Sequence, residues 1–424
     1  MSIEKVDTVV VGAGQAGVAM SEHLGKFDIP HVVLERRRIA ERWRSERWDS
    51  LVANGPAWHD RFPGMTYSAN APGDFPGKEA VADYLVAYAD KIAAPIRCGV
   101  DVQYLERLNG RSGFKVTTSD GSYEAQNVVV ATGPFQIPDI PSLVPENAGI
   151  HQIHSSAYRN PGRLPAGGIL VVGAGSSGVQ IADELARSGR EVWLSVGPHD
   201  RPPRAYRGRD YCWWLGALGK WDAETPDAGA EHVTIAVSGA RGGATVDFRR
   251  LAAQGITLVG RTESYRDGML NFAADLAGNI ARGDANYLSL LDEADAYAVE
   301  FGLHLPEEPE ARTFGADPEC MTNPIRALDL AQSGISSIIW ATGFRRDYSW
   351  IDVDCFTKSG EPRHKRGVSV EPGLFFLGLP WQSRRGSSFI WGVWHDARYV
   401  ADRISTRRRY LDYEGATAPQ PANA

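Results

Sequence analysis

Three glycines near the start of the chain have the spacing that phosphate binding requires. The apolar run VVV leads directly into Gly12-Ala13-Gly14-Gln15-Ala16-Gly17, and a helical pattern follows. Gly12 suits a tight turn, Gly14 lets a pyrophosphate approach the backbone, and Gly17 lets the helix pack on the strand. The helix N-terminus offers free N–H groups to the phosphates. A second apolar run ends at Glu35, whose carboxylate can accept hydrogen bonds from a ribose. The stretch predicts a dinucleotide site.

The same pattern returns in the middle of the chain. The run ILVV at residues 169–172 leads into a second glycine-rich turn, a helical pattern follows, and the next strand reads EVWLSV. The residues expected to face the second nucleotide are Gly173, Gly175, Ser176, Ser177 and Gly178.

The two patterns differ where the second strand ends. The position of Glu35 is taken by Ser195 or Val196, depending on a gap of one residue, and neither is an acid. Arg201 and Arg204 follow, and arginine can hold a 2′-phosphate that an acid would repel. The second nucleotide is therefore expected to be NADPH. Asp200 weakens this interpretation, and a solvated arginine turn is the alternative.

A further strand is also repeated. VVVATG ends at Thr132 and Gly133, and IIWATG ends at Thr342 and Gly343. Duplication of both parts predicts an α/β fold with two Rossmann-like dinucleotide-binding domains. We expect a discontinuous FAD domain (residues 1–163 and 334–424) that encloses an NADPH domain (residues 164–333) with an aromatic-rich insertion.

Two other segments offer contacts to a flavin. Arg36 and Trp43 lie in a stretch rich in Arg and Trp, which predicts either a wall beside a flat ring with an arginine near a phosphate, or a solvated loop with anchoring aromatics. Ser387 precedes a helix expected over about 389–404, whose N-terminus can face the flavin pyrimidine. A capped surface helix is the alternative.

Composition narrows the class of protein. The chain has 424 residues, a formal net charge of −7 and four scattered cysteines. This favours a cytoplasmic protein and argues against nucleic acid, a disulfide framework or a metal cluster. The sequence has no apolar run of about 18 residues and no signal-peptide pattern at its start, so no membrane partner is expected.

The ordered set GAGQAG, ATG, GAGSSG and ATGF resembles the class B flavin-dependent monooxygenases, which include the flavin-containing and Baeyer–Villiger monooxygenases. The resemblance spans nearly the whole chain. It implies that NADPH reduces FAD and that O2 then forms a flavin hydroperoxide. One oxygen atom would pass to a small organic substrate by N- or S-oxygenation, hydroxylation or Baeyer–Villiger insertion.

The chain departs from the family pattern in two places. The signature F-x-G-x-x-x-H-x-x-x-(W/Y/F) keeps His154 and Tyr158, but Ala148 and Ile150 stand at its Phe and Gly positions. The Gly-Asp that many such flavoproteins carry after their last strand is replaced by Leu379-Pro380-Trp381. We expect His154 to serve as a catalytic or linker element, with a structural histidine as the alternative. Asn54 is the expected polar group at the reactive edge, with a turn role as its alternative.

The aromatic-rich residues 205–330 predict either a core or a pocket for an aromatic or apolar substrate. The assembly is open, and a homodimer is one option. Three other functions stay open: an NADPH oxidase or electron-transfer flavoprotein, a disulfide reductase (for which no redox cysteine pair is visible), and a non-catalytic NADPH sensor.

Overall fold

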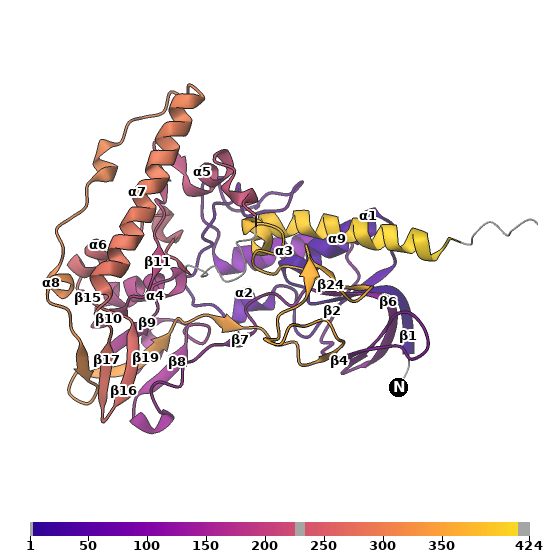
Figure 1. Cartoon of the computed structure of the whole chain (residues 1–424), viewed down its shortest axis with the longest axis horizontal. Coiled ribbons are helices and arrows are strands. Elements are labelled where there is room, and N and C mark those ends of the chain that lie inside the picture. Colours follow the sequence, from indigo (N-terminus) through magenta and orange to yellow (C-terminus); the bar gives the residue numbers. More distant parts are fainter. Residues whose placement is uncertain (1–2, 225–233, 414–424) are drawn as a thin grey trace, which may run out of the picture. The chain divides into compact units, whose positions relative to one another are not determined.

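The structure is a computed structural model that describes residues 3–224 and 234–413 (Figure 1). The chain forms two compact units. Unit 1 comprises residues 1–41, 85–134 and 347–424, and unit 2 comprises residues 42–84 and 135–346. The chain leaves unit 1 just after the first ATG motif and returns to it just after the second. The expected boundaries at 163 and 334 both lie within unit 2, so the division by contacts and the division by sequence differ.

Unit 1 is built on one large sheet. Its parallel part has the order β3-β2-β1-β6-β24, and β4 and β5 extend the N-terminal half of β6 as an antiparallel meander. The strands are β1 (Ile3–Val11), β2 (His31–Glu35), β3 (Ile96–Cys98), β4 (Val102–Arg107), β5 (Phe114–Thr118), β6 (Gly121–Val130), β21 (Ile351–Asp352), β22 (His364–Lys365), β23 (Val368–Ser369) and β24 (Leu374–Phe376). The meander turns between β5 and β6 at residues Asp120-Gly121.

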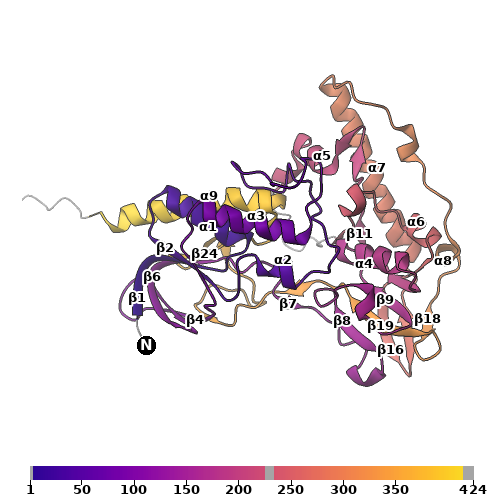
Figure 2. The same ribbon diagram turned by 180° about the vertical axis from the view of Figure 1, so that it is seen from behind.

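Two helices of unit 1 carry the cofactor-binding segments. Helix α1 (Gln15–Lys26) follows the first glycine turn, and α9 (Ile390–Leu411) lies beside it in both ribbon views (Figure 2). Helix α9 is longer than predicted because its arginine-rich end favours helix and is anchored to β1, where Arg408 Nε lies 2.9 Å from Asp7 Oδ2. Helix α3 (Lys78–Lys91) contributes its second half to this unit.

Unit 2 is built on a five-stranded, fully parallel sheet with the order β15-β10-β9-β19-β8. Its strands are β8 (His151–His154), β9 (Gly168–Val172), β10 (Val192–Ser195), β15 (Ile256–Val259) and β19 (Ile335–Trp340). The near-continuous apolar runs of β9 and β19 suit parallel strands that are buried on both faces.

Smaller elements complete unit 2. The strands are β7 (Ile137–Pro138), β11 (His199–Asp200), β12 (Ala205–Tyr206), β13 (Arg209–Asp210), β14 (Thr234–Ile235), β16 (Thr262–Arg266), β17 (Met269–Phe272), β18 (Ala327–Asp329) and β20 (Phe344–Arg345). The helices are α2 (Glu41–Ser45), α4 (Ser176–Arg187), α5 (Tyr211–Ala217), α6 (Phe248–Ala253), α7 (Leu276–Glu300) and α8 (Glu319–Thr322).

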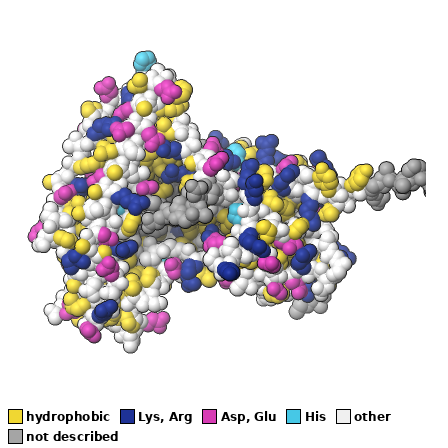
Figure 3. Space-filling view, viewed as in Figure 1, with side chains coloured by type: hydrophobic (Ala, Val, Ile, Leu, Met, Phe, Trp, Pro, Cys, Tyr) yellow, Lys and Arg dark blue, Asp and Glu magenta, His cyan; other side chains and the backbone are white. Residues whose placement is uncertain are grey.

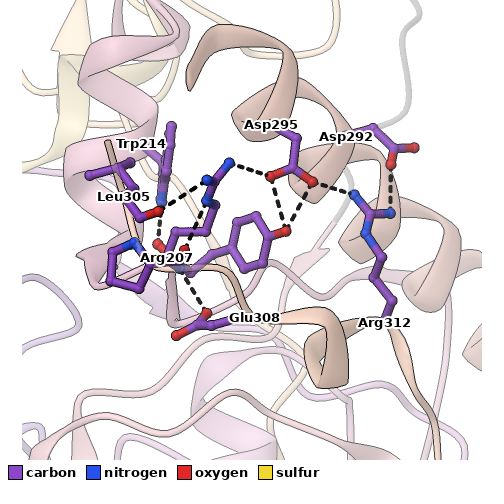
Figure 4. Close-up of polar contacts among 9 residues, drawn as sticks. Arg207, Trp214, Asp292, Asp295, Leu305, Glu308 and Arg312 are labelled. Carbon is purple, nitrogen blue, oxygen red and sulfur yellow. Dashed lines mark hydrogen bonds and ion pairs between the residues drawn. The ribbon is translucent and has the colours of Figure 1, made fainter. Parts of the chain in front are cut away.

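The aromatic insertion packs as core. Tyr206, Trp214 and Tyr287 form a buried cluster with apolar residues of α7. Polar contacts hold its rim, where the Asp295 carboxylate accepts hydrogen bonds from the hydroxyl of Tyr206 and the guanidinium of Arg207 (Figure 4). Of the two alternatives for this region, the structure favours core.

The surface of unit 2 seen in Figure 3 mixes basic and acidic side chains. Within the described ranges, no helix is long and apolar enough to cross a membrane, and no cluster of three or more potential metal ligands occurs.

Candidate cofactor sites

The first glycine turn has the geometry that its sequence predicts. Gly12 has φ +103°, and a Cβ there would lie 2.8 Å from the carbonyl oxygen of Ala131. A Cβ on Gly17 would lie 1.8 Å from the carbonyl oxygen of Gly12. At Gly14, by contrast, no described atom beyond the adjacent residues lies within 4 Å of the Cβ position. The turn therefore leaves open the place where a pyrophosphate would approach the backbone, so its residues fit a bound dinucleotide.

Glu35 braces this turn from the end of β2. Its Oε2 accepts a hydrogen bond of 2.8 Å from the backbone N–H of Ala13, and its Oε1 accepts one of 2.9 Å from that of Arg37. Arg36 follows with an exposed side chain. A carboxylate oxygen can accept more than one hydrogen bond, so Glu35 can hold the turn and still receive a ribose hydroxyl.

The start of α9 lies next to the start of α1. The side-chain amide of Gln15, the first residue of α1, donates a 2.7 Å hydrogen bond to the carbonyl oxygen of Ser388. Ser387 is fully buried, and its hydroxyl accepts hydrogen bonds from the backbone N–H groups of Ser383 and Arg384. Two helix N-termini with their positive dipole ends thus converge beside the open turn.

The first ATG motif ends at the same edge of the sheet. Thr132 and Gly133 follow β6, which is paired with β1, and both are half-buried. Gly133 has φ +74°, a left-handed conformation that favours glycine. The structure therefore brings the first glycine turn, the first ATG motif and the start of α9 together within unit 1.

The second glycine turn repeats the backbone geometry of the first. Gly173 has φ +115°, and a Cβ on Gly178 would lie 1.8 Å from the carbonyl oxygen of Gly173. Thr342, at the second ATG motif, donates its hydroxyl to the carbonyl oxygen of Asp139. The difference lies at Gly175, where a Cβ would meet Cγ2 of Thr234 at 2.4 Å. The hydroxyl of Ser176 also donates a 2.9 Å hydrogen bond to the carbonyl oxygen of Ile235.

The strand register removes the one-residue ambiguity at the second turn. In unit 1 the N–H of Gly12 donates to the carbonyl oxygen of Leu34, and in unit 2 the N–H of Gly173 donates to that of Ser195. Ser195 is therefore the counterpart of Leu34, and Val196 is the counterpart of Glu35. Val196 is buried and apolar, so the residue that takes the place of Glu35 carries no carboxylate.

Arg201 and Arg204 are buried and already paired. The guanidinium of Arg201 lies 2.7 Å from Oδ1 of Asp284, and its Cζ lies 4.5 Å from the ring centre of Tyr287. That of Arg204 lies 2.6 Å from Oδ2 of Asp210 and also donates to the carbonyl oxygen of Asn54. These contacts give both arginines a structural role in unit 2, and their contact with a 2′-phosphate stays a prediction.

Arg261 is a cation that the sequence analysis did not single out. It follows β15, the parallel neighbour of β10, and the hydroxyl of Ser195 contacts both Gly260 and Thr262 on either side of it. Its side chain is 62% exposed, and its Nε lies 3.9 Å from Asp275 Oδ2. Its position two residues after the strand ITLV was the available signal, since adjacent parallel strands end at one edge of a sheet.

The remaining predicted residues lie in unit 2. The side-chain oxygen of Asn54 accepts a 2.9 Å hydrogen bond from Gln180 on α4. Trp43, in the short helix α2, packs against the core, and Arg47 Cζ lies 5.8 Å from its ring centre. These contacts anchor both side chains, and roles in catalysis or flavin binding stay predictions.

His154 is buried and fixed at both ring nitrogens. Nε2 lies 2.8 Å from the carbonyl oxygen of Gly343, and Nδ1 accepts a 3.1 Å hydrogen bond from the N–H of Ser156. These partners require a proton on Nε2, and burial lowers the pKa of His154 below its ordinary value. The neutral ring thus ties β8 to the second ATG turn, and its catalytic role stays a prediction.

Comparison with known proteins agrees with this architecture. Residues 9–205 match the model of the pyridine nucleotide-disulphide oxidoreductase family. The chain is 35% identical over 404 residues to an uncharacterized CzcO-like oxidoreductase of Geobacillus kaustophilus, covering 94% of this chain and 98% of that protein. It is 30% identical over 407 residues to the probable indole-3-pyruvate monooxygenase YUCCA4 of Arabidopsis thaliana, covering 94% of this chain and 89% of that protein.

A solved structure of similar fold agrees with these sequence relatives. A flavin-containing monooxygenase from Stenotrophomonas maltophilia superposes with a TM-score of 0.66 at 19% identity, covering 96% of this chain and 99% of that one. The motifs, the duplicated fold and these relatives lead to one conclusion: the chain belongs to the class B flavin-dependent monooxygenase family of enzymes, whose cofactors are a flavin and a nicotinamide nucleotide.

Proposed function

We propose that the protein is an NADPH-dependent FAD monooxygenase that transfers one oxygen atom from O2 to a small organic substrate. The observation that carries this is the open first turn at Gly14, bounded by Glu35 and two converging helix N-termini, in a chain that repeats the same turn at Gly173. We assign FAD to the first turn and NADPH to the second. The division into an FAD domain (1–163 and 334–424) and an NADPH domain (164–333) is part of the proposal.

The preference for NADPH rests on the end of β10. Val196 offers no acceptor for a ribose 2′-hydroxyl and no negative charge that would repel a 2′-phosphate. We assign the phosphate-binding cation to Arg261, because its side chain is exposed and its Nε lies 3.9 Å from the Asp275 carboxylate, whereas Arg201 and Arg204 are buried and make close ion pairs of 2.7 and 2.6 Å. Arg261→Ala is expected to weaken NADP+ binding at least tenfold, about 1.4 kcal/mol, and to leave NAD+ binding unchanged. Arg266→Ala, on the neighbouring strand, is the control, and equal losses in both variants would contradict the assignment.

The flavin, when bound, accepts hydride from NADPH and activates O2, and this chemistry belongs to the cofactor. The chain binds the phosphates at its two glycine turns and presents the α9 N-terminus to negative charge that develops on reduction. Asn54 and His154 are proposed as the polar residues that support oxygen transfer, His154 through its neutral ring.

The experiment compares the NADPH oxidised with the hydrogen peroxide and the oxygenated product formed. Purified, flavin-loaded protein is reduced anaerobically with NADPH or NADH, and NADPH oxidation is then measured in air against amines, thioethers, ketones and indolic acids. Hydrogen peroxide is measured in parallel. A monooxygenase diverts electrons from peroxide to product with at least one substrate, and NADPH should exceed NADH at least tenfold in reduction efficiency.

An NADPH oxidase is the alternative, because the architecture supplies reduction of a flavin without demanding oxygen transfer. It predicts stoichiometric peroxide with every compound tested. The proportion of NADPH electrons recovered as peroxide separates the two functions.

A further inference from the structure

The two glycine turns match in backbone geometry but differ in what lies over them. Above Gly14 the described residues leave the Cβ position open, whereas above Gly175 the methyl group of Thr234 lies 2.4 Å from it. The middle glycine of this motif is the point at which a pyrophosphate approaches the backbone. Thr234 therefore occupies, in unit 2, the space that a dinucleotide needs.

Residues 234–237, which we call the strap, are held at this place from two sides. The hydroxyl of Ser176, the first residue of α4, donates to the carbonyl oxygen of Ile235 at 2.9 Å and accepts from the N–H of Val237 at 3.3 Å. These contacts occupy a hydroxyl that would otherwise face a phosphate at the helix N-terminus.

On its other side the strap forms a short parallel pairing. Thr234 and Ile235 (β14) align with His199 and Asp200 (β11), and the N–H of Ala236 donates a 2.8 Å hydrogen bond to the carbonyl oxygen of Asp200. Strand β11 follows β10, so the strap lies beside the segment of chain that leaves the strand end at Val196.

The strap makes few buried apolar contacts, although the side-chain amide of Gln180 also donates a 3.0 Å hydrogen bond to the carbonyl oxygen of Val237. Its pairing is two residues long, Thr234 is exposed and Ile235 only half-buried, while Ala236 alone provides a fully buried apolar anchor. Segments with few buried apolar contacts and short pairings open at low free energy. Movement of the strap away from the glycine turn would free the Ser176 hydroxyl and, at the same time, the space above Gly175.

We propose that the strap is a closure of the second site, and that NADPH binds only after the strap has left the glycine turn. The proposal rests on the proposed function, which assigns NADPH to this turn. The apparent affinity for NADPH is then the intrinsic affinity reduced by the fraction of molecules with an open strap. Variants that fix or free the strap should change NADP+ binding and leave FAD binding at the first turn unchanged.

The test uses a reversible disulfide that fixes the strap to β11. Asp200 and Ile235 are aligned partners on adjacent parallel strands, so their Cα separation suits a disulfide. We would introduce Asp200→Cys and Ile235→Cys into a Cys98→Ser background, since Cys98 is the exposed native thiol. Binding of NADP+ and of 2′,5′-ADP to flavin-loaded protein is measured by calorimetry, oxidised and after reduction with dithiothreitol. The oxidised form is expected to bind at least tenfold more weakly than the reduced form.

A second variant works in the opposite direction. Thr234→Gly removes the methyl group above Gly175 and should tighten NADP+ binding severalfold, whereas Thr313→Gly, an exposed threonine outside the strap, should not. If the oxidised and reduced forms of the disulfide variant bind NADP+ equally well and keep full FAD occupancy, the closure role of the strap is contradicted. The proposed function is not affected by that result. Failure of wild-type, flavin-loaded protein to bind either NADP+ or NAD+ would overturn both.

Discussion

Replacement of single glycines in and after the first turn separates flavin binding from folding. Gly14, Gly17 and Gly25 belong to one turn and one helix, and each can be changed to alanine. Apart from chain neighbours and the backbone of its own helix, a Cβ at Gly14 or at Gly25 meets no described atom within 4 Å, whereas a Cβ at Gly17 lies 1.8 Å from the Gly12 carbonyl oxygen. The same methyl group therefore tests three environments.

The magnitudes follow from these contacts. Gly14 is the N-cap of α1 with φ −79°, which alanine can adopt, and exchange of an N-cap glycine for alanine costs about 0.5–1 kcal/mol. The clash at Gly17 is with backbone that cannot turn aside, so we expect the upper part of the overpacking range, about 3 kcal/mol. Gly25→Ala gains up to about 1 kcal/mol in helix propensity. Only Gly14→Ala places its methyl group where the pyrophosphate must lie.

Each variant is measured twice. Urea unfolding of the flavin-free protein gives the free energy of unfolding, and flavin absorbance per chain gives FAD occupancy. We expect Gly14→Ala to be folded and colourless, Gly25→Ala folded and yellow, and Gly17→Ala destabilised. Full FAD occupancy in Gly14→Ala would refute the assignment of the first turn, and an unaltered stability of Gly17→Ala would refute the packing argument.

Three further predictions concern the pH dependence of unfolding, packing and coupling. Burial lowers the pKa of His23 to about 4 from 6.5, so the unfolded chain binds the extra proton between these values. The free energy of unfolding should thus fall by up to about 3 kcal/mol as pH drops through this window, and His23→Gln should flatten the slope measured by urea unfolding. Gly283→Ala should cost about 1–3 kcal/mol, since a Cβ there lies 2.6 Å from His199 Nε2, while Gly278→Ala on the same helix meets no described atom within 4 Å and serves as its control in thermal melts. Asn54→Asp keeps the acceptor for Gln180 but cannot donate, so it should raise the fraction of NADPH electrons released as peroxide, and an unchanged fraction would remove Asn54 from the catalytic residues.

The fold followed from sequence because its signals are local. Each glycine turn is fixed by contacts within a few residues, such as Gly178 against Gly173, and the strand before the second turn, β9, is a continuous apolar run. The compact units were not predicted, because the packing of residues 42–84 with unit 2 depends on contacts far apart in the sequence.

The residues of the two cofactor sites were predicted less fully than the fold, because their positions depend on strand register and on contacts between residues far apart in the sequence. Whether Ser195 or Val196 matches Glu35 depends on strand register, which a single sequence with a one-residue gap leaves open. Arg201 has its carboxylate partner 83 residues away, so its burial carries no local signal. Thr234 reaches Gly175 from a region without a recognisable motif, and the strap could not have been expected.

The central claim, oxygen transfer driven by NADPH, is tested most directly with labelled oxygen. Flavin-loaded protein is supplied with NADPH, 18O2 and the substrate that most reduces its peroxide yield. Mass spectrometry should find one 18O atom per product molecule, with product and oxidised NADPH in a ratio near unity. Recovery of all NADPH electrons as peroxide, with no label in any organic compound tested, would contradict the claim and leave an oxidase.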